Sequence, residues 1–244
     1  MPIISFFQTK GGTGKTTSAF VLAEILSTGN SVTVIDADPN FPFQEWKNDG
    51  GEGEPFEIVT EEDPDQLPIA IQQATGRSAF VIVDNEGSRN QNAGRAIAMS
   101  DLVIITTNGG PLDNKAASKA IKYIRKVGKA AGRKIPFRVL LTQQPAIAQS
   151  RTVKQGIKNM VDNGVPIFET PLVKRDTFMA IFGYNCTLAN VDASKVADPM
   201  KGQFNARSFA LEVARTLKDL RTKADTAAST PKPKARKERE LANA

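Results

Sequence analysis

The chain has 244 residues, a formal net charge of +6 and 40% hydrophobic residues, enough for one packed domain. It contains no histidine and a single cysteine, Cys186, which excludes His-dependent catalysis, His-metal sites and a disulfide framework. No apolar run approaches the roughly 18 residues of a membrane span, and the first residues are typical of a strand rather than a signal peptide. We therefore expect a cytoplasmic protein in a reducing compartment.

The first predicted strand, residues 3–7, leads directly into a glycine-rich loop and then a helix over residues 18–26. Glycines allow successive backbone N–H groups to point at an anion, and a helix N-terminus adds its positive end. A strand, a glycine-rich turn and a helix in this order predict a phosphate-binding loop. Lys15 is expected to reach the β- and γ-phosphates, and the Thr16 hydroxyl to bind Mg²⁺. The predicted nucleotide-binding residues are Gly11, Gly12, Thr13, Gly14, Lys15, Thr16 and Thr17.

This loop departs from the usual phosphate-binding pattern at two positions. Thr9 stands where the pattern has its first glycine, and a second lysine, Lys10, precedes the glycine pair. Two lysines carry more positive charge than one bound nucleotide needs. Lys10 is therefore a candidate to act on a phosphate in a partner subunit.

Acidic side chains follow two later predicted strands. Residues 31–35 lead into Asp36 and Asp38, and the apolar residues 80–83 lead into Asp84. Open α/β sheets bind ligands at the carboxyl ends of their parallel strands, so we expect these carboxylates beside the phosphate loop. An Asp-rich turn in which Asp38 caps a helix is the structural alternative.

The remaining pattern predicts the fold class. Apolar strands over residues 102–107 and 137–141, and a strand-like patch at 56–59, alternate with helical segments. Continuously apolar strands separated by helices predict a doubly wound α/β fold, with a mainly parallel sheet and helices on both faces. We expect a P-loop ATPase domain over residues 1–222. Residues 223–244 are expected to form a disordered basic tail, because their composition cannot bury a core.

Charge is unevenly distributed along the chain. Residues 51–65 hold seven acids and no base, whereas residues 114–161 hold twelve bases and no acid. A predicted helix over 114–131 carries a stripe of lysines: Lys115, Lys119, Lys122, Lys126 and Lys129. A solvated amphipathic helix would explain the stripe alone. The continuation of the basic run beyond this helix favours a surface that faces a polyanion.

Residues 10–17, Lys-Gly-Gly-Thr-Gly-Lys-Thr-Thr, resemble the deviant Walker A motif of the ParA/MinD family of ATPases. The Asp36–Pro39 stretch is similar to the first switch of that family, and Asp84 to its Walker B carboxylate. The resemblance extends from residue 3 to about 183, and more weakly to 220. Short strings such as Pro111-Leu112-Asp113 look most like the conjugative T-strand-transfer branch of the ParA-type positioning ATPases.

The resemblance implies ATP and Mg²⁺ as cofactors. Lys10, Lys15 and Asp38 would be catalytic, with Asp38 orienting the attacking water, and Thr16, Asp36 and Asp84 would hold the metal. It further implies an ATP-dependent homodimer that binds DNA non-specifically, associates with the nucleoid and distributes a plasmid or another large cargo. A ParB-like or cargo-adaptor protein would stimulate hydrolysis. The DNA-binding residues implied are Lys174, Arg175, Arg207, Lys218 and Arg221. Of these, Arg207 and Lys218 are expected to matter more than Lys122 and Lys126, which would contribute to the positive field.

Two other functions use the same loop class. A metabolic enzyme similar to dethiobiotin synthetase would need a substrate pocket that the sequence does not reveal, and a nitrogenase-reductase-like carrier would need two cluster-binding cysteines per subunit. A MinD-like membrane-associated ATPase would need an amphipathic C-terminal helix. The basic tail is too poor in apolar residues for such a helix, so no membrane partner is expected.

Overall fold

The structure is a computed structural model in which residues 1–51, 53 and 55–229 are described. The described residues form a six-stranded sheet in the order β3-β2-β4-β1-β5-β6, and every neighbouring pair is parallel. The strands are β1 (Ile3–Phe6), β2 (Val32–Ala37), β3 (Glu57–Thr60), β4 (Phe80–Asn85), β5 (Leu102–Thr107) and β6 (Phe137–Leu141). The predicted α/β fold class is confirmed, and the sheet is parallel throughout.

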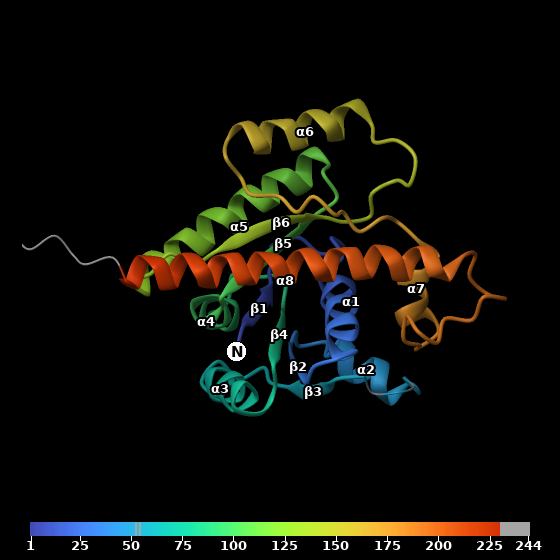
Figure 1. The fold of residues 1–244 in the computed structure, drawn as a ribbon, viewed down its shortest axis with the longest axis horizontal. Coiled ribbons are helices and arrows are strands. Elements are labelled where there is room, and N and C mark those ends of the chain that lie inside the picture. The colour runs from blue at the N-terminus through green and yellow to red at the C-terminus, as the bar shows by residue number, and fades with distance from the viewer. Residues whose placement is uncertain (52, 54, 230–244) are drawn as a thin grey trace, which may run out of the picture.

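Helices cover both faces of the sheet (Figure 1). One face is covered by α1, α2, α7 and α8, and the other by α3, α4 and α5, with α6 packed beside α5. The helices are α1 (Lys15–Ser27), α2 (Pro42–Asn48), α3 (Leu67–Arg77), α4 (Gln91–Met99), α5 (Pro111–Ala130), α6 (Arg151–Asp162), α7 (Asp176–Gly183) and α8 (Pro199–Ser229).

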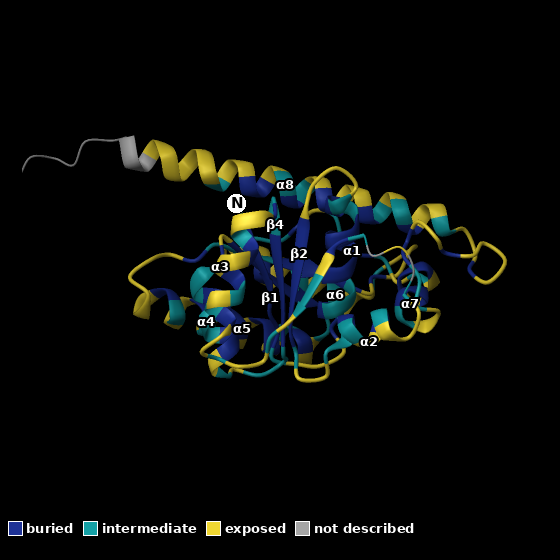
Figure 2. Cartoon of the chain, turned by 90° about the horizontal axis from the view of Figure 1, so that it is seen from below, coloured by how far each residue is buried: buried dark blue, intermediate teal, exposed yellow. Residues whose placement is uncertain are grey.

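Alternate side chains of each strand enter different cores. Ile4 and Val34 pack with the α1 and α8 side chains, whereas Ile3 and Ile35 pack against α3. Because both faces of the sheet are covered, β1, β2 and β5 are mostly apolar and buried from end to end (Figure 2), whereas the edge strand β3 is partly exposed. This rigid sheet fixes the positions of the loops that leave its carboxyl edge.

The last helix is longer than the sequence predicts. We expected a helix over 205–220 and disorder from Lys223, but α8 covers Pro199–Ser229. The prediction of disorder is therefore wrong for residues 223–229, and residues 230–244 lie outside the described part of the chain. Residues 221–229 contain no glycine or proline and include alanine, arginine and lysine, so the helix can continue past its last core contact. No described helix is long and apolar enough to cross a membrane.

Candidate nucleotide-binding site

The glycine-rich loop connects the end of β1 to the start of α1 at the carboxyl edge of the sheet. Gly12 and Gly14 adopt positive φ angles of 73° and 82°, which residues with a side chain rarely accept. Gly14 immediately precedes the first helical residue, Lys15, so the loop ends where the positive end of α1 begins. The predicted strand, loop and helix are therefore present in the predicted order.

Two neighbouring strands hold this loop in place. The Thr13 hydroxyl lies 2.9 Å from the Thr106 hydroxyl at the end of β5. After β6, the Thr142 hydroxyl donates to the Thr13 carbonyl at 2.7 Å, and the Gln143 amide donates to the Gly12 carbonyl at 2.9 Å. The loop conformation is thus fixed by residues about 100 positions away, which no local sequence pattern indicates.

Asp36 and Asp84 lie side by side below the loop, because they are partners in the parallel register of β2 and β4. Both are fully buried, and Asp36 Oδ1 and both carboxylate oxygens of Asp84 have no hydrogen-bond partner. Thr16 lies close enough to Asp84 to lower its pKa, although its geometry falls short of a hydrogen bond to either oxygen. Unpartnered buried carboxylate oxygens are costly unless a cation accompanies them.

Burial dominates the titration of these carboxylates. It raises the pKa of Asp84 to about 7, against the opposing influence of Thr16 and the Lys15 charge. Burial also raises the pKa of Asp36 to about 6. Oxygen ligands of this kind suit Mg²⁺, a hard cation that usually keeps waters and phosphate oxygens among its ligands. No group of three or more His, Cys, Asp or Glu suited to a metal occurs among the described residues, so phosphate oxygens and water would complete the coordination.

Asp36 also accepts hydrogen bonds at the start of α2, a contact that the sequence did not reveal. Its Oδ2 accepts hydrogen bonds from the backbone N–H of Phe43 at 2.9 Å and of Gln44 at 3.4 Å, in the first turn of α2. Asp36, rather than Asp38, therefore caps this helix. Asp38 is only partly buried and accepts from the backbone and side-chain nitrogens of Asn40, at 3.0 and 2.9 Å.

Lys10 forms an ion pair within its own chain. Its ammonium contacts the carboxylate of Asp113 in the first turn of α5. The Asp113 side chain is only 5% exposed, whereas that of Lys10 is 45% exposed. Lys15, in contrast, is 9% exposed, and a Cβ added at Gly87 would come 3.5 Å from its ammonium nitrogen. The two lysines of the loop therefore occupy different environments.

A cavity of about 470 Å³ opens beside the phosphate loop. Its walls include Leu172, Phe178 and Phe182, and Lys174 and Arg175 also line it. Arg175 Nε is buried without a hydrogen-bond partner. The sequence missed the apolar wall, because its residues come from the segment after β6 and from α7, far from the loop in the chain.

The five residues predicted to bind DNA do not form one cluster. Lys174 and Arg175 line the cavity beside the phosphate loop. The other three, Arg207, Lys218 and Arg221, are exposed along α8. About 16 Å of helix separates Arg207 from Lys218.

Comparison with known proteins identifies the family. Residues 1–225 match the family described as VirC1 protein. A protein named ParA from Rhizobium radiobacter is 33% identical over 220 residues, which cover 89% of this chain and 98% of that relative. The chain belongs to the VirC1/ParA family. This confirms the predicted ParA/MinD resemblance. Protein virC1 of Rhizobium rhizogenes is 28% identical over 187 residues, covering 74% of this chain and 80% of that one.

Solved structures share the fold at lower identity. Apo McdA from Cyanothece has a TM-score of 0.66 at 16% identity, over 84% of this chain and 99% of that one. Cobyrinic acid a,c-diamide synthase from Mycobacterium smegmatis, with bound ATP analog and magnesium, has a TM-score of 0.65 at 15% identity, over 89% of this chain and 96% of that one. Identities this low establish the common fold alone.

Proposed function

We propose that this VirC1/ParA-family protein is a Mg²⁺-dependent ATPase that positions a plasmid or another large cargo. The observation that carries the proposal is the pairing of the glycine loop with two buried carboxylates, Asp36 and Asp84, whose oxygens lack partners. A related fold with bound ATP analog and magnesium supports the choice of cofactors.

Different residues of the site would bind the phosphates, the base, the metal ion and the attacking water. The loop N–H groups and the Lys15 ammonium hold the β- and γ-phosphates, and the apolar cavity beside the loop receives the base. Thr16, Asp84 and Asp36 hold Mg²⁺, which neutralises charge on the phosphates when it is bound. Asp38, at the partly exposed end of the first switch, orients the attacking water.

Lys10 acts across a homodimer in this proposal. Its half-exposed ammonium can leave Asp113 and reach the nucleotide of a second subunit, whereas Lys15 already serves the nucleotide of its own chain. There Lys10 would stabilise the charge that develops between the β- and γ-phosphates during transfer.

The ATP-bound dimer would bind DNA without sequence preference and so associate with the nucleoid. Lys174, Arg175, Arg207, Lys218 and Arg221 are the contacts that the family resemblance suggests. A ParB-like or cargo-adaptor protein would stimulate hydrolysis and release the dimer. The similarity to ParA and virC1 proteins supports this positioning role.

A metabolic ligase is the second candidate, since cobyrinic acid a,c-diamide synthase shares the fold with nearly the same TM-score as McdA. The sequence relatives favour the positioning ATPase, because those above 25% identity are ParA, virC1 and carboxysome-distribution proteins.

The test combines two inactive subunits. Lys10→Ala should retain nucleotide affinity within a few-fold but lose ATP-dependent dimerisation and turnover, and Asp38→Ala should dimerise with ATP but hydrolyse poorly. If Lys10 acts in trans and Asp38 in cis, a mixed dimer contains one intact site, and phosphate release should partly recover on mixing.

Lys15→Ala mixed with Asp38→Ala serves as the control, because neither site of that mixed dimer is intact: one cannot bind ATP and the other lacks the carboxylate that orients the water. If Lys10→Ala by itself dimerised with ATP and hydrolysed it at the wild-type rate, the dimer mechanism would be ruled out and a single-chain P-loop enzyme would be favoured.

A further inference from the structure

One face of α5 is a continuous cationic stripe. At 100° per residue its five lysines fall within about 80° of one another, and they span about 21 Å along the helix axis. All five are exposed: Lys115, Lys119, Lys122, Lys126 and Lys129. The opposite side of α5 buries Ala117, Ile121 and Ile124 against the sheet. The orientation of the stripe toward solvent is therefore fixed by the core.

Within the described residues, none of the five lysines has a carboxylate within ion-pair distance. The exposed face of α8 differs, because Arg207, Lys218 and Arg221 share it with the exposed apolar side chains Phe204 and Leu211. The same helix also carries acids, and Glu212 lies 3.9 Å from Arg138. Nearby carboxylates therefore weaken the positive potential of the α5 stripe less than that of α8.

A hollow of about 620 Å³ lies along the middle of the stripe, between α5 and the loop that precedes α4. It is lined by four cations and a tyrosine: Arg89, Lys119, Lys122, Lys126 and Tyr123. The Tyr123 hydroxyl donates to the Asn90 carbonyl at 3.1 Å. The nearby Glu86 carboxylate accepts from Ser88 and Asn90. Four cations around one hollow create a positive potential that would attract an anion.

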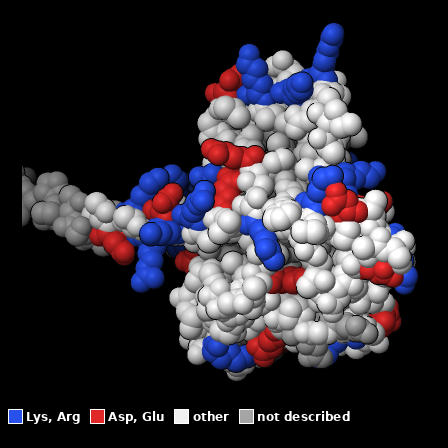
Figure 3. Space-filling view, turned by 45° about the vertical axis from the view of Figure 1, so that its right-hand side comes forward, with Lys and Arg blue, Asp and Glu red and all other residues white. Residues whose placement is uncertain are grey.

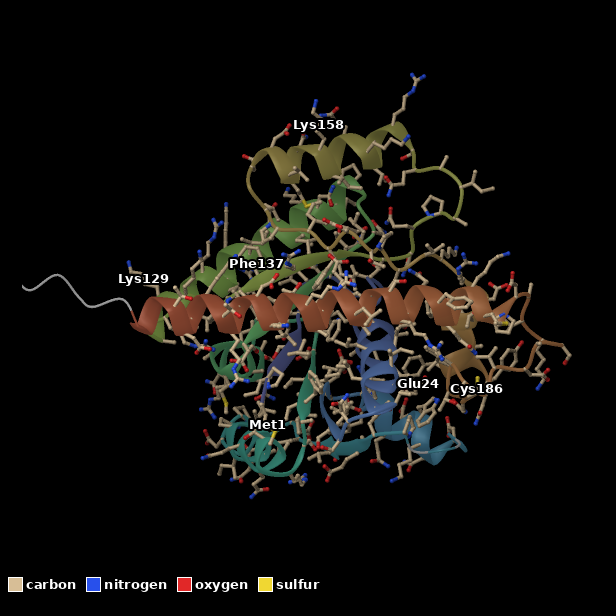
Figure 4. All side chains as sticks on the ribbon, in the orientation of Figure 1. Met1, Glu24, Lys129, Phe137, Lys158 and Cys186 are labelled. Carbon is tan, nitrogen blue, oxygen red and sulfur yellow. The ribbon has the colours of Figure 1, made fainter. Side chains whose placement is uncertain are left out.

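The cationic surface continues onto α6, which packs beside α5. Arg151, Lys154 and Lys158 are exposed there. Figure 3 shows Lys and Arg side chains over the α6 end of the molecule, and Figure 4 places Lys158 on α6 and Lys129 at the far end of α5.

We propose that the α5 stripe and Arg89 form a preformed docking surface for the phosphate backbone of double-stranded DNA. The inference rests on the proposed function and identifies the surface that does the binding. A stripe of about 21 Å spans roughly six base pairs, since DNA rises about 3.4 Å per base pair. This proposal reverses the expectation from family resemblance that the cations of α8 contribute more to DNA binding than the lysines of α5.

The chemistry of the stripe favours nucleic acid over an acidic protein. Protein interfaces depend on apolar or aromatic anchors at their centre, whereas the stripe offers ammonium and guanidinium groups and a single aromatic side chain, the half-buried Tyr123. Phosphates need no such anchor, because counterion release supplies the affinity.

The surface exists in the single chain, so nucleotide-free protein binds DNA weakly at low salt. ATP-dependent dimerisation then joins two copies of the stripe and raises the affinity through effective concentration. Arg89 lies close in the chain to the nucleotide site, since it is two residues from Gly87, where an added Cβ would come 3.5 Å from the Lys15 ammonium nitrogen.

The experiment measures fluorescence anisotropy of a random-sequence 30-base-pair duplex with full-length protein, with and without Mg-ATP, over a salt series. The test variant is Lys119→Gln/Lys122→Gln/Lys126→Gln. Its matched control, Arg207→Gln/Lys218→Gln/Arg221→Gln, removes the same charge from α8. ATP binding, dimerisation and thermal unfolding are measured on both.

We expect the α5 variant to lose at least about tenfold in DNA affinity, with a salt slope reduced by about 0.9 for each lost phosphate contact. Its ATP binding and dimerisation should match the wild type, and the α8 variant should lose less than the α5 variant. Unchanged affinity of the α5 variant, or an equal or larger loss in the α8 variant, would overturn the docking surface but leave the proposed ATPase intact. So would a wild type that binds polyglutamate more tightly than duplex through these lysines. A wild type that binds no duplex under any condition would overturn both the docking surface and the DNA-binding step of the proposed function, and the ATPase assignment would then rest on the ATP-binding and turnover assays alone.

Discussion

At the scale of single residues, Lys10 pairs with Asp113 of its own chain in the monomer, whereas its proposed role in the dimer is to contact the nucleotide of the second subunit. Its pairing with the nearly buried Asp113 gives it a structural contribution as well. The Lys10→Ala substitution leaves the Asp113 carboxylate buried without its cation, which is unfavourable. Because Lys10 is half-exposed, solvent screening reduces the effect.

We predict that Lys10→Ala lowers the free energy of unfolding by about 1 kcal/mol. Urea unfolding measures this, and Lys10→Ala/Asp113→Ala should recover most of the loss because the stranded carboxylate is gone. Turnover should stay low in both variants. Recovery of turnover in the double variant would mean that Lys10 acts by neutralising Asp113 rather than on a nucleotide.

Asp84 predicts a pH dependence of stability. Its pKa is about 7 in the folded chain, against about 3.9 for an unperturbed aspartate, so folding favours the protonated form. The resulting stabilisation is complete below about pH 4 and is lost as the pH rises through 7. Asp36, whose pKa is raised to about 6, acts in the same direction.

In the absence of nucleotide, Asp84→Asn should therefore unfold a few degrees higher than the wild type at pH 8, with little difference at pH 4. Differential scanning calorimetry across this range tests it, and the exposed Asp162→Asn is the control. If Asp84→Asn melted at the same temperature as the wild type at pH 8, burial of the Asp84 carboxylate would not destabilise the folded protein. The same variant should lose Mg²⁺-dependent ATP binding, since it cannot supply a carboxylate.

At the scale of elements, α8 combines a packed body with an unpacked end. Phe209, Val213 and Leu217 are buried against α1 and the sheet, whereas residues 221–226 are exposed. Backbone hydrogen bonds and helix propensity hold this end of the helix, and the Thr222 and Thr226 hydroxyls donate to the carbonyls of Lys218 and Thr222.

Deletion of residues 224–244 should change the melting temperature by less than about 2 °C and leave ATPase activity intact, because the residues of this segment whose burial is described, 224–226, are all exposed. Deletion from Leu217 onward is the comparison, and it should destabilise the protein strongly by exposing the groove that Leu217 and Leu220 fill. A large loss of stability in the shorter deletion would show that residues 224–244 contribute contacts to the fold.

At the scale of the whole molecule, α5 connects the two proposed activities. It begins at the carboxyl edge of the sheet, where Asp113 holds Lys10, and carries its lysine stripe away from that edge. Release of Lys10 toward a second subunit would thus occur at one end of the helix whose body is proposed to meet DNA. The three-layer arrangement keeps this surface open in the monomer, since α4 and α6 pack beside α5 without covering its outer face.

The sequence by itself determined the phosphate loop, the succession of strands and helices, and the family. These depend on local patterns: glycine spacing, continuous apolar runs and short motifs such as the residues around Lys15 and Asp38. The extent of α8 was misjudged because composition alone suggested disorder, although helix propensity continued to Ser229. The basic run of residues 114–161 was visible, but not which of its members gather with Arg89 around one hollow.

Tertiary structure alone decided which distant groups meet. Asp36 lies beside Asp84 because parallel strands β2 and β4 pair in one register, and a shift of one residue would turn a side chain to the other face. The Lys10–Asp113 ion pair and the apolar wall at Leu172 and Phe178 likewise join segments about 100 residues apart or more. Such contacts are set by the packing of the whole sheet and its helices, so no local pattern encodes them.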